Sequence, residues 1–64
     1  MGRTTLAQVK AGEYFRFIDS DTAPVWVRGD YVRGLGKYSC TKFDDMNREM
    51  FKLGGCVVYI GFTF

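Results

Sequence analysis

The sequence predicts an all-β fold, chiefly because residues 24–43 have the pattern of one long β-hairpin. β-Branched and aromatic residues dominate both arms of this segment, and Gly34 and Gly36 lie where the chain would reverse. Such residues favour strands, and glycine supplies the positive φ that a tight turn needs. Aromatic residues make up 17% of the 64 positions, which gives a chain this short a core of large side chains. Residues 1–64 are therefore expected to form one small domain.

The first third of the chain predicts one strand flanked by a tight turn and a loop. Residues 14–18 alternate so that Phe15 and Phe17 share one face. Residues 19–24 are expected to form the loop, because Ser, Asp and Thr side chains bond to nearby backbone and proline removes a backbone donor. Residues 1–5 are polar and are expected to fray, with the next apolar side chains tucked against the body.

The register of the hairpin follows from the position of its turn. With Leu35 and Gly36 as the two central turn residues, Tyr31 lies opposite Cys40. Gly29 falls in the middle of a strand, where a missing side chain indicates a β-bulge. Alternation along the strands then gives the predicted core: Phe15, Phe17, Val25, Val27, Tyr31, Val58 and Ile60.

The C-terminal third predicts a helical turn followed by the most apolar strand of the chain. Residues 44–53 begin with two Asp residues, which suit a helix N-terminus, and are expected to form one helical turn, or a bend that runs into a short strand at residues 50–53. Residues 56–64 are apolar on both faces, so this strand is expected to be interior or to pair with another chain. About five strands and one helical turn predict a small, strongly bent antiparallel sheet or an SH3-like barrel.

Composition excludes several classes of site. The chain has no His, and no second pair of cysteines accompanies Cys40 and Cys56, so no metal site is expected. The two cysteines are expected to be free, part-buried thiols, with a disulfide between them as the alternative. The sequence has no apolar run of about 20 residues that could span a membrane, and it has no apolar signal segment. A cytoplasmic location is therefore expected. No cofactor is predicted.

Four runs of the chain carry a resemblance to a known group of proteins. They are residues 12–17, residues 23–29, residues 37–40 followed by 43–45, and residues 57–60. Together they resemble short, uncharacterised bacterial and phage-borne proteins. The resemblance implies a small β fold and a mobile-element setting, and it transfers no functional residue.

One candidate binding site stands out on the predicted hairpin. Cationic and aromatic side chains alternate there, as they do where small barrels stack bases and follow phosphates. The alternative is that these are ordinary solvated strand residues and core aromatics. The net charge of +2 is too small to indicate a polyanion partner by itself. The candidate residues are Trp26, Arg28, Arg33, Lys37, Tyr38 and Lys42.

A non-catalytic role follows from what the sequence lacks. There is no His, no nucleophile motif and no phosphate-binding glycine loop, so an enzyme is not expected. The predicted function is a small binding module, a protein-interaction or accessory factor of a bacterial mobile element or phage. The alternatives are a nucleic-acid-binding small β-barrel and a structural subunit of a larger assembly. The chain is expected to be a monomer or weak homodimer, with Trp26 exposed beside Arg28 as an interface anchor.

Overall fold

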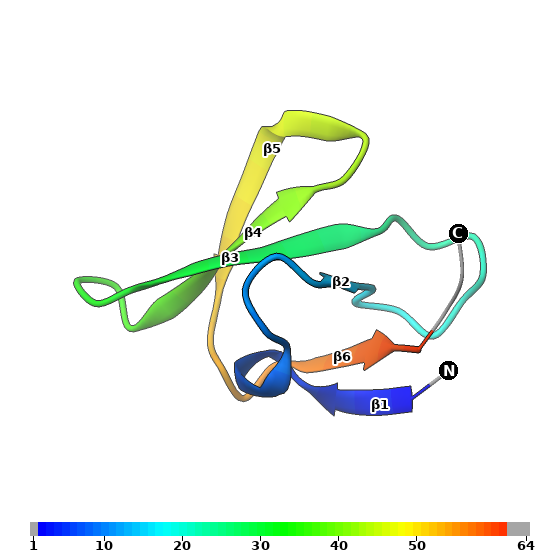
Figure 1. Cartoon of the computed structure of the whole chain (residues 1–64), viewed down its shortest axis with the longest axis horizontal. Coiled ribbons are helices and arrows are strands. Elements are labelled where there is room, and N and C mark those ends of the chain that lie inside the picture. Colours follow the sequence, from blue (N-terminus) through cyan, green and yellow to red (C-terminus); the bar gives the residue numbers. More distant parts are fainter. Residues whose placement is uncertain (1, 62–64) are drawn as a thin grey trace.

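The chain folds into two antiparallel sheets and one short 3₁₀ helix, so the predicted all-β fold is confirmed (Figure 1). The computed structural model describes residues 2–61, without the side chain of Met46. The larger sheet has the strand order β2-β3-β4-β5, and β1 pairs with β6 in the smaller sheet. The elements are β1 (Gly2–Thr5), η1 (Leu6–Gln8), β2 (Tyr14–Phe15), β3 (Trp26–Val32), β4 (Lys37–Lys42), β5 (Asp45–Lys52) and β6 (Val57–Ile60).

A pair of backbone hydrogen bonds joins the two sheets. Arg16 N–H donates to the carbonyl oxygen of Tyr59 at 2.9 Å, and Tyr59 N–H donates to that of Arg16 at 2.8 Å. The 3₁₀ helix adds a second junction, because Leu6 N–H donates to the carbonyl oxygen of Cys56 at 2.9 Å. The expectation that residues 1–5 fray is wrong: Gly2–Thr5 pairs along its whole length with β6, where the apolar strand offers a free edge.

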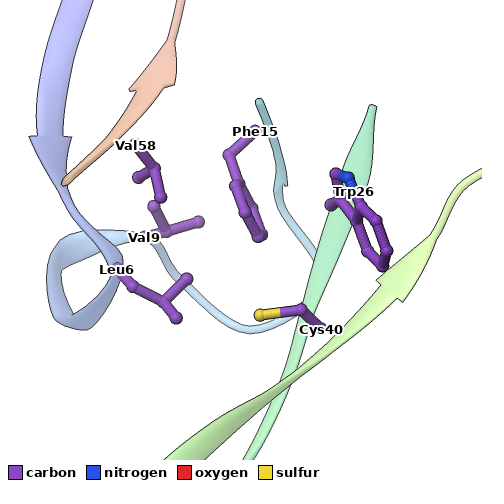
Figure 2. Packing of buried hydrophobic residues seen from close by; sticks show 6 residues of the cluster. All are labelled: Leu6, Val9, Phe15, Trp26, Cys40 and Val58. Atoms are coloured by element: carbon purple, nitrogen blue, oxygen red, sulfur yellow. The ribbon is translucent and has the colours of Figure 1, made fainter. Parts of the chain in front are cut away.

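The core lies between the two sheets. Figure 2 shows the ring of Phe15 between the side chains of Val9 and Val58 and the indole of Trp26. Phe15 and Val58 are fully buried, as predicted. Among the described residues, the buried hydrophobic set is Leu6, Val9, Phe15, Trp26, Cys40 and Val58, with Phe17 and Ile60 among the partly buried residues packed against it.

Two parts of the predicted core need correction. Tyr31 is 49% exposed, so its assignment to the core is wrong. Val25 and Val27 are only half-buried, whereas Trp26 is buried at 8% exposure. The reason is the pairing of β2 with β3, in which Trp26 lies opposite Phe15 and therefore shares its inward face. The neighbouring valines then face outward.

The hairpin register differs from the predicted one because the turn is longer. Residues 33–36 form a four-residue turn in which the N–H groups of Leu35 and Gly36 both donate to the carbonyl oxygen of Val32, at 3.1 and 2.9 Å. Tyr31 consequently lies opposite Tyr38, not Cys40. The register also shifts between Arg28 and Tyr31, so the β-bulge predicted at Gly29 is confirmed. A Cβ atom at Gly29 would lie 3.1 Å from Ser39 Oγ, so glycine allows this close approach.

The helical turn expected in residues 44–53 does not form, whereas the short strand expected at residues 50–53 is present as the end of a longer strand. Asp45–Lys52 forms β5, and the one helical turn of the described residues lies at η1. The carboxylate of Asp45 accepts a hydrogen bond from Asn47 N–H at 3.2 Å, in an irregular stretch where the register with β4 shifts. Such local bonding by Asp serves a bulge as well as a helix cap. The last predicted strand is shorter than expected at Val57–Ile60, and its predicted residues 62–64 lie outside the described residues.

Replacing Phe15 with alanine tests the core. Phe15 is fully buried between the sheets, so Phe15→Ala is expected to lower the free energy of unfolding by about 3–5 kcal/mol. Ile18 is 62% exposed, and Ile18→Ala serves as the control with an effect within about 0.5 kcal/mol. Chemical denaturation followed by circular dichroism measures both. A cooperative Phe15→Ala transition at the wild-type midpoint would contradict this packing.

The two turn glycines are expected to respond differently to alanine. Gly36 has a φ of +66°, a left-handed conformation that costs an L-residue about 1–2 kcal/mol, whereas Gly34 has no such φ and has open space around it. Gly36→Ala should therefore lower the free energy of unfolding by about that amount, and Gly34→Ala should leave it unchanged or slightly raise it. Equal losses for the two variants in thermal and denaturant unfolding would show that the turn has a different geometry.

Candidate functional site

The structure separates the six predicted site residues along the hairpin. Trp26 and Lys42 lie opposite each other at one end of β3 and β4. Arg28 and Tyr38 lie in the middle part of the hairpin, and Arg33 and Lys37 lie at its turn. The predicted cluster is therefore not a single surface.

Trp26 does not serve as an exposed anchor. Its side chain is buried at 8% exposure, and its ring packs against that of Phe17 with centroids 5.5 Å apart. The expectation that Trp26 lies on an outward face beside Arg28 is wrong, because both residues face the inner side of the sheet and only Trp26 reaches the core. Tryptophan here contributes to folding.

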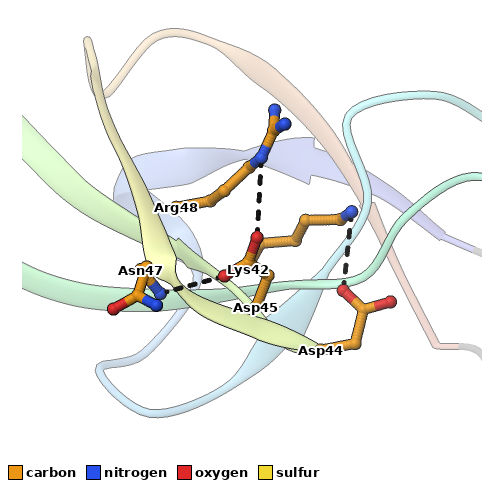
Figure 3. Close-up of polar contacts among 5 residues, drawn as sticks. All are labelled: Lys42, Asp44, Asp45, Asn47 and Arg48. Atoms are coloured by element: carbon orange, nitrogen blue, oxygen red, sulfur yellow. Dashed lines mark hydrogen bonds and ion pairs between the residues drawn. The ribbon is translucent and has the colours of Figure 1, made fainter.

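The Lys42 end of the hairpin carries locally paired charges (Figure 3). Lys42 Nζ lies 3.5 Å from a carboxylate oxygen of Asp44, and Arg48 Nε lies 3.6 Å from one of Asp45. These ion pairs are solvent-exposed, so each contributes little to stability. They do, however, neutralise the two cations of this end of the sheet.

The turn end of the hairpin combines aromatic rings with cations. The guanidinium carbon of Arg28 lies 4.2 Å from the ring centroid of Tyr38, which is a cation–π contact. The rings of Tyr31 and Tyr38 are 4.9 Å apart and tilted by 59°. Tyr31 is absent from the predicted site residues; a four-residue turn would have indicated it, because that turn places Tyr31 opposite Tyr38. We call the following residues the turn-end patch: Arg28, Tyr31, Arg33, Lys37, Tyr38 and Lys52.

The cations of the turn-end patch differ from those at the Lys42 end. Within residues 2–61, no carboxylate lies within 4.0 Å of the charged nitrogens of Arg28, Arg33, Lys37 or Lys52. Arg28 Nε is buried and has no hydrogen-bond partner. Lys37 and Lys52 both line a hollow of about 650 Å³, together with Phe51 and Leu53. These four cations therefore have no ion-pair partner among the described residues; Arg28 and Lys52 instead lie over aromatic rings, with Lys52 Nζ 5.8 Å from the ring centroid of Phe17.

The opposite face of the larger sheet presents a row of side chains that sequence reasoning missed. The register aligns Tyr14, Val27, Thr41 and Glu49 across the four strands. Tyr14 and Phe43 pack edge to face with centroids 5.5 Å apart, although they are 44% and 45% exposed. The sequence signal for this surface is Tyr14 directly before Phe15: because neighbouring strand residues face opposite sides, an inward Phe15 places the ring of Tyr14 on the outer side. We call the following residues the outer face: Tyr14, Val27, Thr41, Phe43, Glu49 and Phe51.

The two thiols are free, as predicted, and that of Cys40 is not activated for catalysis. Cys40 is fully buried and Cys56 is half-buried. Burial raises the pKa of the Cys40 thiol to about 11, an effect that the nearby Cys56 reinforces and that Lys52 and Arg28 partly oppose. Reactive cysteines have lowered pKa values, so Cys40 behaves as a core side chain.

The described residues contain no arrangement typical of a metal centre or a membrane helix. No group of three or more His, Cys, Asp and Glu side chains in residues 2–61 is placed to hold a metal ion. No helix in that range is long and apolar enough to cross a membrane.

Comparison with family models, with curated proteins and with solved structures finds no match for this chain. The resemblance to bacterial and phage-borne proteins therefore stays a prediction, and the surfaces described above are the basis for a functional assignment.

The raised pKa of Cys40 predicts a loss of stability in alkali. The unfolded thiol titrates near 9.0 and the folded one near 11, so between these values only the unfolded state gives up its proton. The contribution of this group is complete below pH 9 and is lost as the pH rises towards 11. Under reducing conditions, the free energy of unfolding should fall more steeply between pH 9 and 10.5 for the wild type than for Cys40→Ala. Parallel pH profiles would contradict the assignment.

Proposed function

We propose that the chain is a small non-catalytic binding module that docks on a protein partner through its outer face. The observation that carries the proposal is the pair Tyr14 and Phe43, two rings in edge-to-face contact that keep nearly half of their surface in solvent. Aromatic residues are enriched in protein interfaces, where they contribute much of the binding energy. Two adjacent rings on one sheet face suit such a role.

The surroundings of the two rings define the chemistry of the partner. Val27 and Thr41 continue the row across the sheet, and Phe51, at 38% exposure, adds a third ring. The exposed residues Asp44 and Glu49 carry the carboxylates at the margin. One oxygen of Asp44 is paired with Lys42 at 3.5 Å. One oxygen of Glu49 accepts a hydrogen bond from Ser39 Oγ at 2.6 Å, so each carboxylate has a second oxygen left for a partner. A matching surface has an apolar centre for the rings and cationic side chains at its rim.

The chemistry of the thiols and hollows favours a protein-interaction role over catalysis. The buried Cys40 thiol has a raised pKa, and the hollows of the described chain contain no acid, base and nucleophile in mutual contact. An accessory factor of a bacterial mobile element or phage is the setting that the sequence resemblance implies. A structural subunit that binds copies of itself is the competing function, and it would use the same rings.

Site-specific cross-linking tests this function. A photo-reactive phenylalanine analogue at position 43 is expected to capture a partner protein from host cells, while the same group at the exposed position 18 does not capture it. The purified partner should then bind the wild type at least about tenfold more tightly than Tyr14→Ala or Phe43→Ala, because truncating an interface anchor costs 2 kcal/mol or more. Calorimetry measures the affinities, and Ile18→Ala is the matched control.

Two outcomes would overturn the proposal. Unchanged affinity in both alanine variants, with their folds intact by circular dichroism, would exclude the outer face as the docking surface. Cross-links only between copies of the chain, together with a concentration-dependent mass in sedimentation, would assign the rings to self-assembly and favour the structural subunit.

A further inference from the structure

We propose that the turn-end patch binds single-stranded nucleic acid. The rings of this site are separate from the outer face, because Tyr31 and Tyr38 belong to the other side of the sheet, whereas Lys37, at the turn end of β4, alternates to the outer-face side. Tyr38 lies on the face of β4 that carries the buried Cys40, whereas Thr41 and Ser39 alternate to the other side. The turn of the hairpin projects beyond β1 and β6 (Figure 1), so the turn-end residues reach past the smaller sheet.

The aromatic part of the patch provides a stacking surface. Tyr31 is 49% exposed and rests against Tyr38 at 4.9 Å, and Tyr38 in turn is covered by the guanidinium of Arg28 at 4.2 Å. Gly54 allows the ring of Tyr38 to lie where it does, since a Cβ there would be 3.0 Å from Tyr38 Cε2. A ring fixed from behind and open in front can stack on an unpaired base. Bases inside a duplex are not accessible to such a ring.

The cations of the patch provide the electrostatic part. Arg28, Arg33, Lys37 and Lys52 have no carboxylate within 4.0 Å in the described chain, in contrast to the paired Lys42 and Arg48. Asp30 is the one carboxylate on β3, and it lies at the bulge between Arg28 and Tyr31. Four cations around two adjoining, tilted rings match a short segment of phosphate backbone with its bases turned inward.

The exposed ring of Tyr31 distinguishes nucleic acid from an acidic protein segment as the ligand. A shallow hollow lined by Lys37, Lys52 and the outer-face residue Phe51 lies beside the patch. An acidic protein segment would satisfy the cations and leave the exposed ring of Tyr31 without a stacking partner. We therefore favour nucleic acid.

Fluorescence anisotropy with labelled oligonucleotides tests the proposal. A 12-nucleotide oligo(dT) is expected to bind more tightly than a 12-base-pair duplex, and the logarithm of its affinity should fall with the logarithm of salt concentration with a slope of about −2 to −3 for three or four phosphate contacts. Tyr31→Ala should weaken binding at least about fivefold, and Tyr31→Phe should preserve it, because both rings stack alike. Arg33→Gln and Lys37→Gln should each lower the magnitude of the salt slope by about 0.7.

The controls separate this site from general positive charge and from the outer face. Arg3→Gln removes an exposed cation of β1 and should leave both affinity and salt slope unchanged. Equal loss in Arg3→Gln and Arg33→Gln, equal affinity for oligo(dT) and for an oligoglutamate of the same charge, or no salt-dependent binding by the wild type would overturn the proposal. Because Tyr31→Ala leaves the outer face intact, it should still bind the cross-linked protein partner, so failure of one site is distinguishable from failure of the other.

Discussion

The two hydrogen bonds between Arg16 and Tyr59 are the constraint on which the arrangement of the sheets depends. Strand β2 contains two residues, too few to fix its own position by pairing along a neighbour. The reciprocal bonds at 2.9 and 2.8 Å attach its end to β6, and this attachment holds the side chain of Phe15 over Val58. Once Phe15 is fixed, its partner Trp26 must also face inward, and the opposite side of the larger sheet is turned to solvent.

The unequal lengths of the two sheets then determine where surfaces remain open. Strands β1 and β6 span four residues each, whereas β3 spans seven. The smaller sheet can therefore cover only the Trp26 half of the hairpin. Beyond the bulge at Gly29, the inner face is only partly covered: Tyr38 packs against the edge of the core, Arg28 covers its ring, and Tyr31 rests against it in solvent. The inner face of the hairpin is thus buried at its Trp26 end and more exposed at its turn end, because the smaller sheet covers only the Trp26 end.

Features governed by a single residue could be predicted from the sequence, and features governed by pairing could not. Phe15 in the core, the bulge at Gly29 and the positive φ of Gly36 each follow from local chemistry and are confirmed. The hairpin register was wrong because two glycines flank the reversal, and both a two-residue and a four-residue turn are compatible with them. Segment 44–53 was assigned a helical turn because Asp suits both a helix cap and a bulge. The site prediction failed at Trp26 for the same reason as the register: only the β2–β3 alignment decides which way it points.

The free side of β5 has a consequence for solubility. In the described chain β5 has β4 as its sole strand neighbour, so one side of an eight-residue strand leaves backbone donors and acceptors open to another chain. Four of its residues are charged, namely Asp45, Arg48, Glu49 and Lys52, and its pairing with β4 is irregular near its start. Charges and bulges on an edge strand oppose edge-to-edge growth of sheets between molecules. These four side chains therefore protect a protein rich in exposed aromatic residues from fibrillar aggregation.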